Sequence, residues 1–205
     1  MFNKYNFSIA NIPIENSTRP EISGVFIKPN ESVATDSFCM IKVSTPKVNI
    51  SDYPKVQNKP KPIINFKPFI LSSQKAKNIK DIISKIKNDT FPILSNAVLY
   101  HRDDKQVEIG ATDLESCQSV LSNVIEGEYP KYNEIFLKKG KYIKISVNPD
   151  FLVKIASFFS SFDKDKTIEM EIPENPKSPI RFYAKNKDTG QEATALLMPM
   201  QGSQN

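Results

Sequence analysis

Hydrophobic residues alternate with polar ones within residues 19–45 well enough to predict two β-strands, and further short hydrophobic runs along the chain are strand-like. The strands are expected at residues 5–9, at two places within 19–45, and at 63–71, 92–100, 106–111, 118–125, 167–172, 180–184 and 193–198. Four prolines interrupt the alternation from residue 46 to residue 62. Because proline cannot donate to a strand ladder, this segment is expected to be a connector or an arm that covers a sheet edge.

After residue 72 the hydrophobic period becomes that of a helix. Four isoleucines recur at i, i+3, i+4 and i+7 and form one apolar stripe: Ile79, Ile82, Ile83 and Ile86. Ser72 or Ser73 can cap the start of this helix, which is expected to end near Asn88. The opposite side carries Lys77, Lys80, Lys87 and Ser84. Taken alone, this row of lysines indicates a helix face turned toward solvent.

A second helix is predicted to begin at Asn148, Pro149 and Asp150. The asparagine can cap the helix, proline suits the first helical position, and the acid faces the positive end of the helix dipole. Six residues are expected to be buried on one side: Phe151, Leu152, Ile155, Phe158, Phe159 and Phe162. The other side is small and polar, with Lys154, Ser157, Ser160 and Ser161.

One hairpin pattern occurs twice, first as TRPEISGVFI with ESVATDSFCMIKV and then as TFPILSNAVLY with QVEIGATDLESC. Pro20 and Pro92 open the two copies, and an Ala-Thr-Asp sequence closes each. A repeated hairpin indicates one supersecondary unit used more than once. Asp36 and Asp113 follow threonine at a strand end, where aspartate accepts hydrogen bonds from backbone amides. Their repeated position favours a structural role in the turn over an acid or base in catalysis.

Helices with one apolar side and strands that need a cover predict an α+β fold. Two amphipathic helices lying on one curved antiparallel sheet would satisfy both requirements. Each helix would then leave a face of lysine and serine directed away from the sheet.

Composition and charge add little that is specific. The chain has 205 residues, of which 39% are hydrophobic and 25% charged, and no apolar run approaches the length that spans a membrane. The net charge of +5 comes almost entirely from lysine. Lysine attracts a polyanion without the bidentate geometry that reads guanine, and the same surplus suits an ordinary solvated surface. Cys39 and Cys117 are expected to be reduced thiols of a cytoplasmic protein without a signal peptide.

Signatures of catalysis are scarce in this sequence. Its single histidine, His101, lies in a charged turn and is expected at the surface. The motifs HExxH, GxSxG, GxxxxGK[ST] and CxxC do not occur, and metal-ligating residues do not cluster. We therefore expect a protein that is not an enzyme and that holds no metal or cofactor.

Several segments, taken in order, resemble the bacterial DNA sliding clamp, the β processivity subunit of the replicative polymerase. They are PILSNAVL, ATDLES, VIEGEYPKY, KISVNPDFLVKI and LLMPM, and the earlier RPEISGV and ATDSFCM are similar to the hairpin that opens the family's second domain. The resemblance implies a non-catalytic ring whose helices line a central hole and whose sheets form the outer wall. Bacterial members have three domains of two half-modules each, whereas this chain shows about three half-modules.

The resemblance also implies a domain organisation. Residues 1–65 would form a partial half-module with a proline-rich connector, residues 66–200 a domain of two half-modules, and residues 201–205 a tail. The protein would form a homo-oligomeric ring around double-stranded DNA, bind it without sequence preference, and associate with the nucleoid in the cytoplasm. The residues expected to face DNA are Lys77, Lys80, Lys87 and Lys154.

A pocket for short peptides of DNA polymerase, the clamp loader and repair proteins is the second implied feature. Carried over onto this sequence, it would consist of Ile22, Thr35, Ser37, Phe38, Met40, Pro130, Ile135, Leu196, Met198, Pro199 and Met200. Phe38 and Cys39 stand where the family has histidine and arginine, so the peptide preference is expected to differ. If the later hairpin occupies the equivalent place, the pocket would instead use Leu94, Thr112 and Leu114.

Two functions therefore remain open at this point. One is a clamp-like processivity factor that tethers a polymerase or another DNA-acting partner to duplex DNA. The other is an adaptor of the same fold that binds peptides without encircling DNA.

Overall fold

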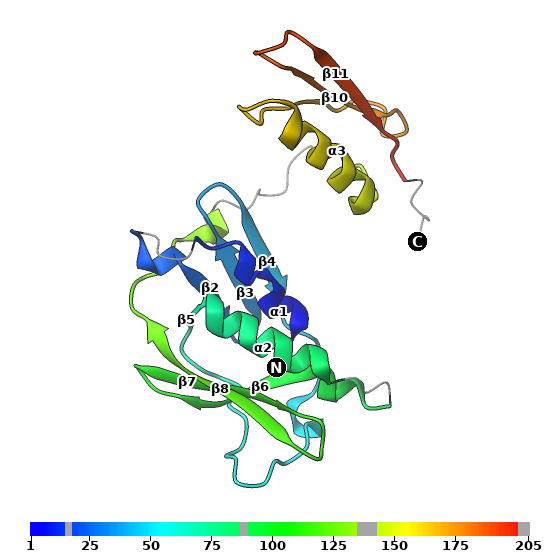
Figure 1. Ribbon diagram of the computed structural model, residues 1–205. Helices are drawn as coiled ribbons and strands as arrows, with labels where there is room; N and C mark the ends of the chain where they lie inside the picture. The colour runs from blue at the N-terminus through cyan, green and yellow to red at the C-terminus, as the bar shows by residue number, and fades with distance from the viewer. Residues whose placement is uncertain (15–17, 87–89, 135–142, 201–205) are drawn as a thin grey trace. The chain divides into compact units, whose positions relative to one another are not determined.

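A computed structural model of the protein describes residues 1–14, 18–86, 90–134 and 143–200. The chain folds into two compact units, Met1–Ile135 and Phe136–Asn205, which we call unit 1 and unit 2 (Figure 1). The expected boundary between residues 65 and 66 therefore falls within unit 1. It does so because strands from both sides of that position belong to one eight-stranded sheet.

Unit 1 consists of two half-modules, each with a strand, a helix and three further strands. Half-module A contains β1 (Phe2–Asn3), α1 (Lys4–Ser8), β2 (Gly24–Lys28), β3 (Glu31–Thr35) and β4 (Met40–Ser44). Half-module B contains β5 (Phe69–Ser72), α2 (Ser73–Lys85), β6 (Asn96–Arg102), β7 (Gln106–Thr112) and β8 (Cys117–Ile125). Short 3-10 turns at Pro20–Ile22 and Pro92–Ser95 precede β2 and β6, as the two opening prolines of the repeat suggest.

The first strand of each half-module pairs with a strand of the other, and β5 also stays paired with β8 of its own half-module. The order of the antiparallel sheet is β1-β6-β7-β8-β5-β2-β3-β4, so β1 of half-module A extends the sheet of B at β6, and β5 of half-module B pairs with β2 of A. In both pairings the residue that caps the helix pairs with the first residue of the receiving strand. These pairs are Asn3 with Asn96 and Ser72 with Gly24.

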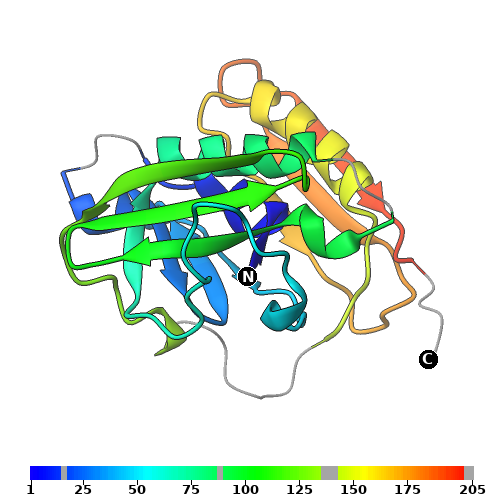
Figure 2. The ribbon, with the colours of Figure 1, turned by 90° about the horizontal axis from the view of Figure 1, so that it is seen from below.

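Helices α1 and α2 contact each other and cover one face of this curved sheet (Figures 1 and 2). Ala76, Ile79 and Ile83 of α2 are buried there against strand residues such as Ile27 and Leu99. The capping serine is Ser72, whose hydroxyl accepts a hydrogen bond from the Lys75 amide at 3.4 Å. The predicted amphipathic helix and its burial are thus confirmed.

Residues 5–9 were predicted as a strand, and this prediction is wrong. They lie in α1 and the 3-10 turn that follows it, Ile9–Asn11. Asn3 and Asn6 form a reciprocal capping box, in which each side chain accepts a hydrogen bond from the other residue's amide. Two such caps stabilise the start of a short helix and outweigh the weak alternation of this segment. Phe7 then points into the core and is fully buried.

The segment between β4 and β5 packs over unit 1 as an arm. Tyr53 is buried beside Val98 and Tyr100 of β6. Its hydroxyl donates a hydrogen bond to the Asn96 carbonyl at 3.3 Å and accepts one from the Thr112 amide at 3.2 Å. The prediction of a covering arm is confirmed, and burial raises the pKa of Tyr53 to about 12, so its hydroxyl stays protonated at neutral pH.

Both Thr-Asp sequences form the same turn. The Asp36 carboxylate accepts hydrogen bonds from the amides of Phe38 (2.8 Å) and Cys39 (2.7 Å). Asp113 does the same for the amides of Glu115 (3.1 Å) and Ser116 (2.6 Å). The predicted structural role of these aspartates is confirmed. The residue after each aspartate has positive φ, 78° at Ser37 and 82° at Leu114, a backbone geometry that the repeated hydrogen bonds hold in place.

Asp103, in the β6–β7 turn, is expected to make the stability of the folded protein depend on pH in the acid range. Backbone hydrogen bonds from Gln106 and Lys105, with the His101 ring at 2.9 Å, lower the pKa of Asp103 to about 2 from its ordinary 3.8. The unfolded chain therefore binds this proton at higher pH than the folded chain, and the contribution of Asp103 to stability is lost as the pH falls from about 4 to about 2. We expect Asp103→Ala to unfold at a lower temperature than the wild type at pH 7.

The difference in melting temperature between Asp103→Ala and the wild type should shrink progressively as the pH is lowered from about 4 to about 2, as measured by circular dichroism. Asp104→Ala, in the same exposed turn, is the control and should show a smaller difference at pH 7. A constant difference for Asp103→Ala between pH 7 and pH 2 would contradict the assignment.

Unit 2 contains one further half-module, which we call half-module C. It consists of α3 (Pro149–Phe162), β9 (Glu169–Glu171), β10 (Ile180–Lys185) and β11 (Glu192–Leu197), with the strand order β11-β10-β9. The predicted helix start is confirmed, because the Asn148 side chain accepts a hydrogen bond from the Asp150 amide at 2.8 Å. The expectation that this helix and α2 share one sheet is wrong: α2 lies on the eight-stranded sheet and α3 on the three-stranded one.

Burial along α3 is less complete than predicted. Phe159 is buried against Phe182 and Leu197, and Ile155 and Phe162 are partly buried beside it. Phe151, Leu152 and Phe158 are exposed instead. The physical reason is that three strands are too narrow to cover the whole apolar side of the helix.

Among the described residues, no helix combines the length and the hydrophobicity needed to cross a membrane.

Candidate functional site

A cavity of about 340 Å³ opens on unit 1 beside the first Thr-Asp turn. It is lined by Arg19, Ile22, Thr35, Ser37, Phe38, Cys39, Met40 and Pro130. Six of these residues were expected in the peptide pocket, and the structure brings these six together. Arg19 and Cys39 were not expected; Cys39 lies between Phe38 and Met40, and Arg19 directly precedes Pro20, which opens the first hairpin. The volume lies in the range of small-ligand sites.

Three elements of unit 1 build this pocket. The 3-10 turn Pro20–Ile22 places buried Ile22 at the base. The turn that follows β3 carries Ser37 and Phe38 at the rim, and β4 begins at Met40. The hydroxyl of Thr35 donates to the Cys39 carbonyl at 2.8 Å and accepts from the Ser37 amide at 3.2 Å. Thr35 therefore shapes the turn, beside which Phe38 is exposed and Met40 partly exposed.

Phe38 is the most exposed large hydrophobic residue described, with 94% of its surface accessible. Exposing a whole aromatic side chain has an unfavourable hydration free energy, which binding of an apolar partner would relieve. The Asp36 carboxylate beside it stays ionised, since backbone hydrogen bonds lower its pKa. Desolvation and that carboxylate raise the pKa of the Cys39 thiol, so Cys39 is a poor nucleophile at neutral pH. The pocket is thus suited to binding rather than to covalent chemistry.

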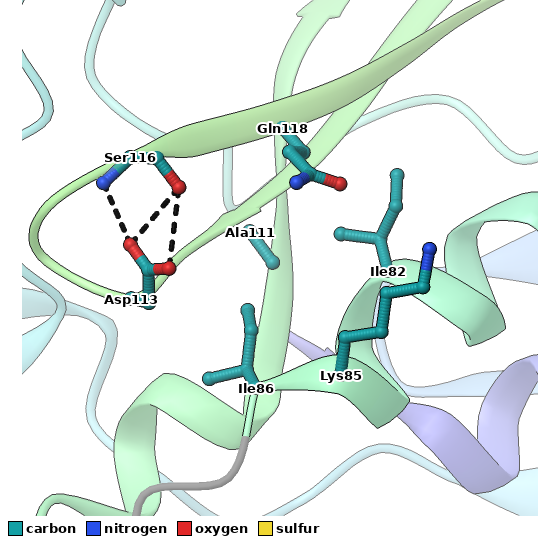
Figure 3. A pocket seen from close by; sticks show the side chains of 7 residues that line it. All are labelled: Ile82, Lys85, Ile86, Ala111, Asp113, Ser116 and Gln118. Carbon is teal, nitrogen blue, oxygen red and sulfur yellow. Dashed lines mark hydrogen bonds between the residues drawn. The ribbon is translucent and has the colours of Figure 1, made fainter.

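The second copy of the hairpin, which contains Asp113, has a much smaller cavity beside it. Leu94 and Thr112 are buried, and of the alternative trio only Leu114 is exposed. The cavity next to it measures about 50 Å³ and is lined by Ile82, Lys85, Ile86, Ala111, Asp113, Ser116 and Gln118 (Figure 3). Figure 3 shows Asp113 turned toward Ser116, to which it is hydrogen-bonded, with Ile82 and Ile86 of the α2 end filling the other side. Such a volume holds a water molecule or two rather than a peptide side chain.

The remaining residues of the expected pocket are distributed differently. Ile135 lies outside the described residues. Leu196, Met198, Pro199 and Met200 belong to unit 2, where Leu196, Met198 and Met200 are exposed and the Met200 amide donates to the Ser146 carbonyl at 2.8 Å. The residues that line the cavity beside Phe38 all belong to unit 1.

The expected DNA-facing lysines lie on both units. Lys77 and Lys80 are partly exposed on α2, and Lys80 lies one turn after buried Ala76, beside the buried face of the helix. Lys154 is exposed on α3, with its ammonium 5.3 Å from the centre of the Phe151 ring. Lys87 lies outside the described residues. Of the three described lysines, Lys154 is thus exposed and the two on α2 are partly exposed.

Among the described residues, no group of three or more histidine, cysteine, aspartate or glutamate side chains could hold a metal ion.

The fold is that of the bacterial DNA sliding clamps. The β subunit of Streptococcus pyogenes DNA polymerase is 16% identical, with a TM-score of 0.64 over 97% of this chain and 48% of that one. The H. pylori β clamp, solved with diflunisal, is also 16% identical, with a TM-score of 0.64 over 99% and 49%. DNA polymerase III subunit β from Borrelia burgdorferi, solved with a natural product, is 12% identical, with a TM-score of 0.63 over 95% and 44%.

The chain thus spans about half the length of these clamps. No protein-family model matches its sequence, and no curated protein matches it. The predicted fold class, amphipathic helices packed on curved antiparallel sheets, is confirmed.

Proposed function

We propose that this protein is a sliding-clamp-type processivity factor, which tethers a polymerase or another DNA-acting partner to duplex DNA and performs no chemistry itself. The observation that carries this proposal is the clamp fold, which extends over 95% to 99% of the chain in the comparisons above. The pocket beside Phe38 and the lysines of α2 and α3 are consistent with it.

The proposed contact with DNA is electrostatic and independent of sequence. Lysine neutralises phosphate as a point charge and does not select a base, so a duplex can be held and still slide. Each phosphate contact adds roughly −0.9 to the slope of log affinity against log salt. The few contacts offered by Lys77, Lys80 and Lys154 give weak binding in one subunit. Retention on DNA would therefore come from a closed homo-oligomeric ring.

The proposed partner site is the pocket at the first Thr-Asp turn. Phe38 and Met40 present apolar surface that a hydrophobic side chain of a linear peptide can cover. Methionine repacks readily around different side chains, so one pocket can serve a polymerase and a clamp loader in turn.

A second candidate, a peptide-binding adaptor that does not encircle DNA, is favoured by one observation. Arg19 through Met40 and Pro130 all lie in unit 1, so peptide binding at this cavity requires neither a ring nor a second chain.

Topological retention on DNA separates these functions. The protein would be incubated with nicked circular plasmid, clamp loader and ATP, then passed over a sizing column before and after the plasmid is cut once. A clamp elutes with the circular plasmid and is lost from the linear one. Equal retention on both forms, or none on either while peptide still binds, would contradict the processivity function and leave the adaptor.

A further inference from the structure

The aromatic ring of Phe38 is available to a partner on the surface of unit 1. It is 94% exposed, and among the described residues neither a cation nor another ring is in contact with it. Other exposed rings have such a neighbour: the ammonium of Lys4 lies 5.2 Å from the centre of the Tyr5 ring, and Phe158 stacks on Phe162. Phe38 therefore presents an aromatic face that the folded chain itself does not use.

Formation of the turn does not explain an aromatic residue at this position. The two Thr-Asp turns have the same backbone hydrogen bonds, and the residue two places after the aspartate is Phe38 in the first turn and Glu115 in the second. Both side chains are exposed. Because the same turn forms with glutamate, the ring is not required for folding. We therefore attribute it to binding.

A carboxylate is held beside the ring. The Asp36 carboxylate accepts a hydrogen bond from the amide of Phe38 itself at 2.8 Å, so its negative charge lies next to the residue that carries the ring. A second hydrogen bond, from the Cys39 amide at 2.7 Å, and the positive φ of Ser37 fix this arrangement. The ring and the carboxylate are thus close enough for one long side chain to reach both.

Neighbouring cations do not neutralise this carboxylate. Within the part of the chain that the structure describes, Asp36 forms no ion pair. Arg19 is the one charged side chain described in the cavity wall, and its Nε is 3.1 Å from the Glu21 carboxylate. A carboxylate and the face of an aromatic ring both attract cations and repel anions such as the phosphates of nucleic acid. The surface beside Phe38 therefore suits a cation.

We propose that the pocket selects linear peptides in which a lysine or arginine stands next to a hydrophobic residue. The hydrophobic side chain enters the cavity, while the cation covers the Phe38 ring and pairs with Asp36. A cation within about 6 Å of a ring centre is attracted to the face of the ring, and the carboxylate adds a second attraction. The inference rests on the proposed peptide site and names the chemistry of its partner.

Selection from a random library tests this preference without a known partner. Short random linear peptides displayed on phage would be selected on the immobilised full-length protein. The wild type is expected to enrich lysine or arginine beside a hydrophobic residue. Asp36→Asn keeps a side-chain oxygen for the hydrogen bonds of the turn but loses the charge, and it should enrich the hydrophobic residue with less of the cation. Asp113→Asn, the same change in the second turn, is the control and should select as the wild type does.

The contribution of the cation is then measured on one pair of peptides. The most enriched peptide would be made with lysine and with norleucine, which keeps the apolar stem but lacks the ammonium. By fluorescence anisotropy, the wild type is expected to bind the lysine peptide roughly 10-fold more tightly. This ratio should fall in Asp36→Asn and in Phe38→Leu, which keeps an apolar side chain without the aromatic face, and should persist in Asp113→Asn. A purely structural effect would weaken both peptides equally and leave the ratio unchanged.

The outcomes separate this inference from the peptide site on which it rests. Equal affinity of the wild type for both peptides, with Phe38→Ala losing both, would overturn the contact with the cation and leave the peptide site in place. A ratio that is unchanged in Asp36→Asn and Phe38→Leu would also overturn the contact. If no peptide is enriched, or if Phe38→Ala binds as the wild type does, the peptide site fails and the inference fails with it.

Discussion

Replacing Phe38 by alanine is expected to weaken binding of a partner peptide roughly 30-fold, which corresponds to the loss of about 2 kcal/mol typical of an aromatic residue at the centre of an interface. The side chain is 94% exposed in the free protein, so its removal takes away little of the folded core. The free energy of unfolding should therefore stay within about 0.5 kcal/mol of the wild type. Affinity would be measured by fluorescence anisotropy with labelled peptides that tile the subunits of a bacterial replicative polymerase and its clamp loader.

The repeat supplies a matched control for Phe38. Leu114 follows the second Thr-Asp pair, has the same positive φ region as Ser37, and is 58% exposed. Its neighbouring cavity of about 50 Å³ is too small for a peptide side chain. Leu114→Ala should bind peptide as the wild type does. Equal loss in both variants, or loss in Leu114→Ala alone, would show that the first hairpin does not form the peptide site.

Reversing the charge of Lys80 and Lys154 is expected to abolish retention on circular DNA while peptide affinity is unchanged. Each reversal removes a phosphate contact and adds a repulsive charge, so the salt slope should fall in magnitude by about 0.9 per lysine in each subunit. Because Lys80 and Lys154 lie on α2 and α3 and outside the pocket, the peptide site should be unaffected. Retention would be measured by the plasmid assay across a series of salt concentrations.

A control with the same overall charge is required, since net charge alone affects DNA binding. Two lysine-to-glutamate changes lower the net charge by 4, from +5 to +1, wherever they are made. Lys105 and Lys177 are exposed in turns and not on the helix faces. The pair Lys105→Glu and Lys177→Glu should therefore leave retention close to that of the wild type. If both pairs lose DNA equally, the helices do not face the duplex.

Local signals in the sequence determined the helix starts and the repeated turns. Ser72 and Asn148 cap α2 and α3 because a short polar side chain there can accept a hydrogen bond from the first turn. Asp36 and Asp113 close equivalent turns because a carboxylate two or three residues before an amide can reach it. These interactions span only a few residues, so the sequence is sufficient to predict them. Six of the residues that line the cavity are ones that the resemblance to clamps implied.

Pairing between distant segments was decided by the tertiary structure. Nothing local in residues 2–3 or 69–72 indicates that β1 pairs with β6 and that β5 pairs with β2 as well as with β8. These pairings join the two half-modules into one sheet, so the boundary of the unit falls near residue 135 and not at 65. The extent to which α3 is buried is likewise decided by the tertiary structure. Its sequence specifies an apolar side, but how much of that side is buried depends on the width of the sheet beneath it. Three strands cover Phe159 and leave Phe158 exposed, because burial depends on which surfaces meet and not on periodicity alone.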